Sequence, residues 1–230
     1  KVSFERRLKG LSLKVGPLGE HDRLLTFLSD QEGLTRLAVP GARRPKSSLA
    51  STTPLNFMEL QVTGSRGLSK VRQIKLHRSF NSVGQRLETL AAAQAIAELT
   101  QMLVPANDPL PGLLSTVLIH LERLDLLSKE DVENGDLVLA TFVQASLHIL
   151  ALGGYGLPIQ RCCKSGSILD PPLGEWDWRC SLLPNEGFAI GTNPNAVIQL
   201  NPSELALLQR LLAPNLPKRG DGQLMGPREV

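Results

Sequence analysis

The feature that most constrains the fold is an alternation of apolar and polar residues in the first 80 positions of the chain. It recurs in segments separated by glycine, proline and aspartate, which favour turns. The segments are Leu11–Val15, Arg23–Ser29, Gly33–Val39, Met58–Val62 and Gln73–His77. Successive side chains of a strand point to opposite faces, so this period of two predicts five half-buried strands.

Five short strands in so few residues favour a small barrel, either closed or partly open. The OB-fold is the usual five-stranded solution, and its groove often binds oligonucleotides. An SH3-like barrel is the structural alternative, and the count of strands does not separate the two. Phe27 is expected in the barrel core, whereas Phe57 alternates with Met58 and Leu60 and is expected to face outward.

The composition becomes helical after Phe80. The expected helices are Leu87–Val104, Pro111–Leu127, Leu137–Leu152 and Ser203–Leu212, and short connections between the first three favour antiparallel packing. Pro202 and Asn201 suit the start of the last helix. Residues 155–200 look irregular. We therefore predict an α+β protein with a barrel domain over residues 1–80 and an α-helical domain over residues 81–230, the latter with an irregular insertion at about residues 155–200.

Charge is distributed unevenly between these two parts. Residues 1–80 hold 15 Lys and Arg against 6 Asp and Glu, whereas residues 81–230 hold 10 against 16. A basic module beside an acidic one suggests different partners for each, and nucleic acid is the natural polyanion for the first. A solvated basic surface is the simpler alternative.

The most informative basic segment is the loop from Gly41 to Ser47, which holds Arg43, Arg44 and Lys46. An Arg fork matches phosphate oxygens, and Lys adds a mobile charge. Further candidate DNA-binding cations lie on or near the strands: Lys14, Arg23, Arg36, Arg66, Lys70, Arg72 and Lys75. Strict alternation would separate Lys75 from Arg72 and Arg78. Since aromatic residues are scarce, we expect binding that depends on charge and therefore on salt.

The sequence offers little for catalysis, cofactors or membranes. It contains none of the common hydrolase, metalloprotease, nucleotide-loop or dinucleotide motifs. Its three cysteines, Cys162, Cys163 and Cys180, match neither a disulfide framework nor a complete zinc site. No signal peptide opens the chain, and Leu137–Leu152 is too polar for a membrane span. We expect a cytoplasmic protein that is not an enzyme and has no metal or other cofactor.

The N-terminal part resembles the RecO family. The residues that carry the resemblance are the run Leu18-Gly19-Glu20-His21-Asp22-Arg23-Leu24-Leu25-Thr26, then Gly33-Leu34, then Gly41 to Ser47, with Pro54 and Met58–Leu60 following in order. The resemblance continues more loosely through the helices and returns at Gly153-Gly154-Tyr155, Arg161-Cys162 and Leu200–Leu212. It spans nearly the whole chain.

The resemblance implies an N-terminal OB-fold, a helical domain and, in many members, a zinc-ribbon-like insertion. Relatives often carry Cys-x-x-Cys-Gly where this chain has Cys162-Cys163-Lys164-Ser165-Gly166, and no second cysteine pair follows Gly187. We therefore expect an insertion without zinc. Relatives also usually continue beyond the position of Val230 into another helix, so we expect that this segment is either absent from the given sequence or disordered. Lys1 likewise suggests that a start residue is missing.

The resemblance further implies a bacterial recombination mediator near the nucleoid. Such a protein binds single- and double-stranded DNA, anneals strands and helps RecR to load RecA onto DNA coated by single-stranded DNA-binding protein. The acidic C-terminal tail of that coating protein is a further expected partner. Arg123 and Lys129 are candidates to hold its carboxylate in an apolar groove. The alternatives are an OB-fold adaptor for protein assembly with incidental DNA affinity and, without an acidic metal-binding cluster to support it, a nuclease.

Overall fold

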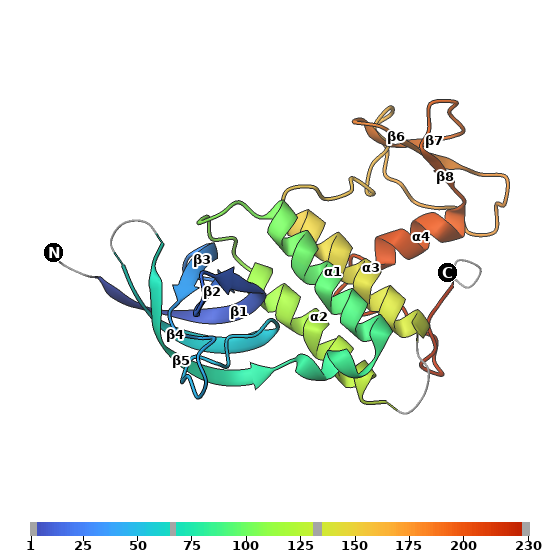
Figure 1. The fold of residues 1–230 in the computed structure, drawn as a ribbon. Helices are drawn as coiled ribbons and strands as arrows, with labels where there is room; N and C mark the ends of the chain where they lie inside the picture. Colours follow the sequence, from blue (N-terminus) through green and yellow to red (C-terminus); the bar gives the residue numbers. More distant parts are fainter. Residues whose placement is uncertain (1–3, 65–67, 131–134, 227–230) are drawn as a thin grey trace. The chain divides into compact units, whose positions relative to one another are not determined.

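The computed structural model describes residues 4–64, 68–130 and 135–226. The chain divides into two compact units, Lys1–Gly153 and Gly154–Val230. The first unit contains a β-barrel and three long helices, and the second contains a small sheet and one helix (Figure 1). The barrel and the long helices thus share one compact unit, and the domain boundary predicted near residue 80 stays a prediction.

Within the described ranges, the barrel has five strands in the ring order β1-β2-β3-β5-β4. They are β1 (Glu5–Leu18), β2 (Asp22–Ser29), β3 (Gly33–Val39), β4 (Asn56–Thr63) and β5 (Lys70–Ser79). All neighbours pair antiparallel except β3 and β5, whose short parallel contact pairs Ala38 with Lys70 and closes the ring. This Greek-key arrangement is OB-like, as predicted.

The barrel interior follows the alternation in the sequence. Met58, Leu60 and Val62 of β4 are fully buried, while the residues between them are half-buried. Phe27 fills the same interior and is 0% exposed, which confirms its predicted place in the core. Phe57 lies outside this core and packs against a second apolar cluster, that of the helices.

Three helices complete the first unit. They are α1 (Leu87–Leu103), α2 (Leu113–Ser128) and α3 (Gly135–Leu152), close to the predicted ranges, and a short 3-10 helix, η1 (Asn81–Gln85), precedes them. Their shared core also takes in Leu11, Leu28 and Leu34 from the outer side of the barrel. Among the described helices, only α3 is long and apolar enough to cross a membrane, and core helices commonly have these properties too.

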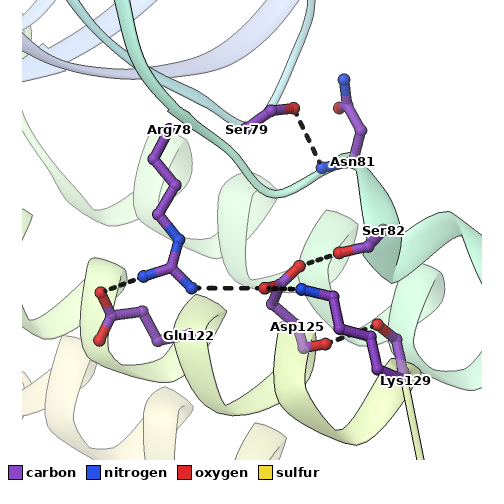
Figure 2. Close-up of polar contacts among 8 residues, drawn as sticks. Arg78, Ser79, Asn81, Ser82, Glu122, Asp125 and Lys129 are labelled. Carbon is purple, nitrogen blue, oxygen red and sulfur yellow. Dashed lines mark hydrogen bonds and ion pairs between the residues drawn. The ribbon is translucent and has the colours of Figure 1, made fainter.

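A buried carboxylate joins the barrel to the helices (Figure 2). Asp125 of α2 has a side chain only 3% exposed, and it accepts hydrogen bonds from Ser82 of η1, Arg78 of β5 and Lys129 of α2. Arg78 Nη2 is 3.3 Å and Lys129 Nζ is 2.8 Å from Asp125 Oδ2. Arg78 also reaches Glu122 at 2.7 Å. This cluster ties the end of β5 to the C-terminal end of α2.

The second unit is more ordered than the sequence predicts. Residues 155–200, expected to be irregular, include a three-stranded antiparallel sheet of order β7-β6-β8. Its strands are β6 (Cys180–Leu183), β7 (Gly187–Ile190) and β8 (Ile198–Leu200). Strands of three or four residues are too short to establish a recognisable alternation, which explains the difference.

The helix of the second unit is α4 (Pro202–Arg210). Its start confirms the prediction from sequence, since the Asn201 side chain accepts from the Glu204 amide and the Glu204 side chain accepts from the Asn201 amide. Pro202 occupies the first turn, where its missing amide hydrogen is not needed. Leu205 of α4 joins Phe188 and Leu183 in the core of this unit.

Candidate nucleic-acid interface

The basic loop after β3 is built on a buried anchor and exposes its cations. Ala42 is 2% exposed, whereas Arg43, Arg44 and Lys46 are all exposed. Asp22, the first residue of β2, accepts the Gly41 amide hydrogen at 2.7 Å, so its carboxylate fixes the start of the loop. Arg43 donates from its backbone to His21 and from Nη1 to Gly19, at 2.9 and 3.2 Å. The loops before β2 and after β3 therefore meet at one rim of the barrel.

Arg23 has an internal role in this structure. Its Nη1 donates to the carbonyl oxygens of Ala50 and Thr52, at 3.3 and 2.5 Å. The guanidinium thereby holds the long connection between β3 and β4 against β2. Arg66, another predicted contact, lies outside the described residues.

A set of cations gathers on the outer side of β1, β4 and β5, which we call the open face. Directly opposed residues of antiparallel strands lie on the same side of a sheet. Three successive rows across β1, β4 and β5 are Lys9–Glu59–Lys75, Arg7–Gln61–Gln73 and Glu5–Thr63–Lys70. Of these, Arg7, Lys9, Lys70 and Lys75 are exposed cations, and Glu5 and Glu59 are the acidic residues.

Two β-bulges in β5 bring Arg72 and Arg78 to this same face. The register of β4 with β5 shifts between Phe57 and Met58 and again between Gln61 and Val62. Arg78 therefore opposes Phe57, and Arg72 Nε donates to the hydroxyl of Thr63 at 3.0 Å. The expectation that Lys75 is separated from Arg72 and Arg78 was wrong, because each bulge inserts one residue and reverses the alternation.

The cations of the open face are available to a ligand. Within the part of the chain that the structure describes, none of Arg7, Lys9, Lys70, Arg72 and Lys75 forms an ion pair with a carboxylate. Two neighbouring arginines differ in this respect, since Arg6 pairs with Glu32 and Arg78 with Glu122 and Asp125.

Arg7 and Lys9 were missed by the reading of the sequence. They flank the buried Leu8, and this alternation extends the pattern of Leu11–Val15 towards the N-terminus. Gly10 interrupts the pattern, which concealed the true start of β1 at Glu5. The alternation around Leu8 was the signal that could have found both cations.

An aromatic group lies at one end of the open face. The half-buried Phe57 ring has Lys9 Nζ 5.4 Å from its centroid and the His77 ring centroid 5.8 Å away. His77 Nε2 is also 3.7 Å from Glu59 Oε2. The outward position predicted for Phe57 is consistent with these contacts.

The outer side of β1, β2 and β3, which we call the covered face, differs in character. Its row Leu11–Leu28–Leu34 is buried in the helical core. The neighbouring row Lys14–Thr26–Arg36 carries two exposed predicted cations. A hollow of about 290 Å³ lies beside them, with Gln101 and Ala106 from the end of α1 and the following loop forming its other wall.

The two helical candidates have partners within the first unit. Arg123 Nη1 donates to Gln144 Oε1 at 2.6 Å, and Lys129 pairs with the buried Asp125. An apolar groove of about 370 Å³ does lie between α1 and α3. Its lining residues include Ala91, Ala95, Val138, Leu139 and Phe142.

The cysteines of the second unit do not compose a zinc donor set. Cys162 Sγ accepts the Ile190 amide hydrogen at 3.4 Å, and Ser165 stands in place of a second thiol. Burial acts to raise the pKa of Cys162, but hydrogen bonds from Ser165, Ile190 and Lys164 outweigh it and lower that pKa to about 7. Among the described residues, no three His, Cys, Asp or Glu side chains gather closely enough to hold a metal ion. A zinc ion needs four such ligands in a structural site, so these residues do not fit one.

Comparison with known proteins accounts for nearly the whole chain. Residues 4–80 match the family model described as "Recombination protein O N terminal", and residues 84–222 match "Recombination protein O C terminal". A protein of Prochlorococcus marinus strain MIT 9313 named "DNA repair protein RecO" is 70% identical over 229 residues, which is 100% of this chain and 86% of that protein. Proteins of the same name from Synechococcus strain WH7803 and Trichodesmium erythraeum are 63% and 30% identical, over 100% and 90% of this chain and 85% and 79% of their own lengths.

Proposed function

The chain belongs to the RecO family of DNA repair and recombination proteins, and from that premise we propose that it is a non-enzymatic mediator that binds DNA through its basic barrel. Family membership supports a role in DNA repair and recombination. The observation that carries the finer proposal is the group of exposed cations on the barrel, most of which lack an ion-pair partner among the described residues.

Charge explains how such a surface would bind DNA without reading its sequence. Each Lys or Arg that neutralises a phosphate releases condensed counterions, which drives binding at low salt. The proposed contacts are Arg43, Arg44 and Lys46 in the loop and the cations of the open face. Lys14 and Arg36, also predicted from the sequence, lie on the covered face beside Gln101 and Ala106, and we assign no phosphate contact to them. We assign Arg23 to the support of the barrel connection because its guanidinium already serves two carbonyl groups.

Annealing requires no catalytic residue under this proposal. Two complementary strands repel each other through their phosphates, and a cationic surface that binds both lowers that repulsion. We further propose that RecR acts with this protein to load RecA onto DNA coated by single-stranded DNA-binding protein. The protein would carry out these steps in the bacterial cytoplasm, close to the nucleoid.

The helical bundle is the proposed contact for the C-terminal tail of the coating protein. The groove between α1 and α3 would take the apolar residues of such a tail. Arg123 and Lys129 remain the proposed cations for its carboxylate. Each would first have to exchange its present partner, Gln144 or Asp125.

The test is a titration of a fluorescent single-stranded oligonucleotide with the protein at two salt concentrations. We expect tight binding at low salt, a steep loss as salt rises, and equal affinity for a scrambled oligonucleotide. The triple change Arg43→Ala, Arg44→Ala and Lys46→Ala should weaken binding and make the salt dependence shallower by about two, at roughly 0.7 for each lost phosphate contact with a single strand.

The second candidate function, favoured by the apolar groove between α1 and α3, is an adaptor that assembles proteins. It predicts no binding of the oligonucleotide at low salt together with measurable binding of a protein partner. Undetectable cleavage of DNA with magnesium present would remove the nuclease alternative.

A further inference from the structure

We propose that the protein holds single-stranded DNA on the open face, with one base stacked at Phe57, and not on the β2–β3 face that OB-folds commonly use. This inference rests on the proposed function, since it assumes that the barrel binds DNA. Beyond that function, the inference identifies the side of the barrel that binds the DNA strand and the residue that distinguishes single-stranded DNA from duplex DNA.

The usual OB surface is obstructed in this protein. OB-folds typically bind oligonucleotides across the face of β2 and β3 and with the loops beside it. Here Leu28 and Leu34 on that face are 1% and 8% exposed because the helical core covers them. The loop after α1 also pairs with the edge of β3 next to this face, since Ala106 forms a parallel bridge to Leu34 and the Asn107 amide donates to the Leu34 carbonyl at 2.9 Å.

The fit of that loop on β3 is close. A side chain at Gly33 would place its Cβ 2.3 Å from the carbonyl oxygen of Asp108, a distance that no real side chain tolerates. Gly33 also has a φ of +67°, so both the close contact with Asp108 and the backbone conformation favour glycine at this position. The row with Lys14 and Arg36 stays exposed, and the end of α1 forms a wall beside it. A strand lying along the covered face would meet the helical core at Leu28 and Leu34 and the loop at the edge of β3.

The open face has room for a strand and the charge to hold one. Its rows are two residues apart, which is about 6.8 Å along a strand. From the row of Phe57 to the row of Lys70, it therefore extends about 20 Å, enough for several phosphates of one chain. Six cations occupy this length against two carboxylates, and all of them except Arg78 have no ion pair in the described ranges.

Phe57 supplies what a purely electrostatic surface lacks. Base stacking on an aromatic ring is the usual sequence-tolerant contact of single-strand binders, and a base inside a duplex cannot make it. Lys9 now lies over the Phe57 ring, and the His77 ring is tilted against it. A base that takes the place of Lys9 on the ring would release its ammonium group for the adjoining phosphate.

The first test compares charge changes on the two faces of the full chain. Lys9→Gln with Lys75→Gln removes two charges from the open face, and Lys14→Gln with Arg36→Gln removes two from the covered face. All four side chains are exposed, so both variants should fold, which circular dichroism can check. For a labelled oligothymidine, we expect about tenfold weaker binding and a salt slope shallower by about 1.4 from the first variant, and less than a twofold change from the second.

The second test isolates the aromatic ring. Phe57→Leu keeps apolar packing against the helical core, and Phe57→Tyr keeps a ring. We expect about tenfold weaker binding of oligothymidine by the leucine variant, wild-type binding by the tyrosine variant, and unchanged affinity of both for a duplex of equal length. Equal losses for duplex and single strand would show that Phe57 only supports the fold, and would overturn the stacking proposal.

The results separate the two levels of the proposal. If the wild-type protein binds oligothymidine but only the Lys14 and Arg36 changes weaken it, the open face is not the site while the mediator function survives. If the wild-type protein binds neither single strands nor duplexes even at low salt, the proposed function itself fails.

Discussion

The cluster around Asp125 is expected to be a main source of stability in the first unit, and Asp125→Asn tests this directly. The substitution keeps the shape of the side chain but removes the charge that faces Arg78 and Lys129. Asparagine can still accept from the hydroxyl of Ser82, so the change measures mainly the charged part of the interaction.

The expected magnitude follows from the exposure of each partner. Removing one member of a fully buried ion pair costs about 3 to 5 kcal/mol, because the remaining charge is left buried. Here the side chains of Arg78 and Lys129 are 41% and 53% exposed, so water can solvate them after the change. Weakening hydrogen bonds to a charged acceptor should cost about 1.5 to 3 kcal/mol, and we expect about 2 kcal/mol in all.

Glu122→Gln is the matched control. Glu122 pairs with the same Arg78 at 2.7 Å, but its side chain is 49% exposed. Loss of such a surface pair should cost about 0.2 to 1 kcal/mol. The two carboxylates therefore differ in burial while sharing one partner.

The assay is thermal unfolding of the full chain followed by circular dichroism. For a protein of this size, 1 kcal/mol shifts Tm by about 2 to 4 °C, so Asp125→Asn should lower Tm by about 4 to 8 °C and Glu122→Gln by about 4 °C or less. A double-mutant cycle with Arg78→Met should give a coupling energy of about 1 kcal/mol. If Asp125→Asn lowers Tm no more than Glu122→Gln does, burial does not strengthen this cluster and the reasoning is wrong.

Three further predictions concern protons, thiols and metal. Burial, assisted by the charges of His148 and Arg123, lowers the pKa of His120 from 6.5 to about 4. Between these two pH values the unfolded chain binds a proton that the folded chain does not bind, so the free energy of unfolding should fall by up to about 3 kcal/mol as pH drops from 6.5 to 4. Urea titrations at several pH values should show this fall, and a smaller one in His120→Asn. Iodoacetamide should modify the exposed Cys163 of the native protein and leave Cys180 unmodified, because burial raises the pKa of the Cys180 thiol to about 11. Mass spectrometry that finds Cys180 modified first would contradict this prediction. Because the second unit has an apolar core in place of a zinc donor set, EDTA should leave Tm unchanged within about 1 °C, whereas structural zinc sites lose stability when chelated.

Much of the fold could be predicted because it depends on local patterns. The alternation of Met58, Leu60 and Val62 appears in both the sequence and the barrel, and the start of α4 was predicted because Asn201 and Pro202 act on neighbouring residues alone. The basic loop with Arg43 and Arg44 was also visible, because a loop that follows a strand exposes its charges. In each case the physical cause acts within a few residues.

The assignment of individual cations to the interface depended on contacts between distant parts of the chain. Arg23, Arg72 and Lys75 are equivalent basic residues in the sequence, yet only the structure shows that the first supports a loop and the other two share the open face. The bulges that produce this sharing come from the pairing of β4 with β5, which the sequence of either strand does not specify. Likewise, the helical core covers Leu28 and Leu34, and the loop at Ala106 pairs with the edge of β3, through contacts that are distant in the sequence. Periodicity therefore predicted the five strands, whereas long-range pairing and packing decided the type of barrel and which of its faces remains free to meet a ligand.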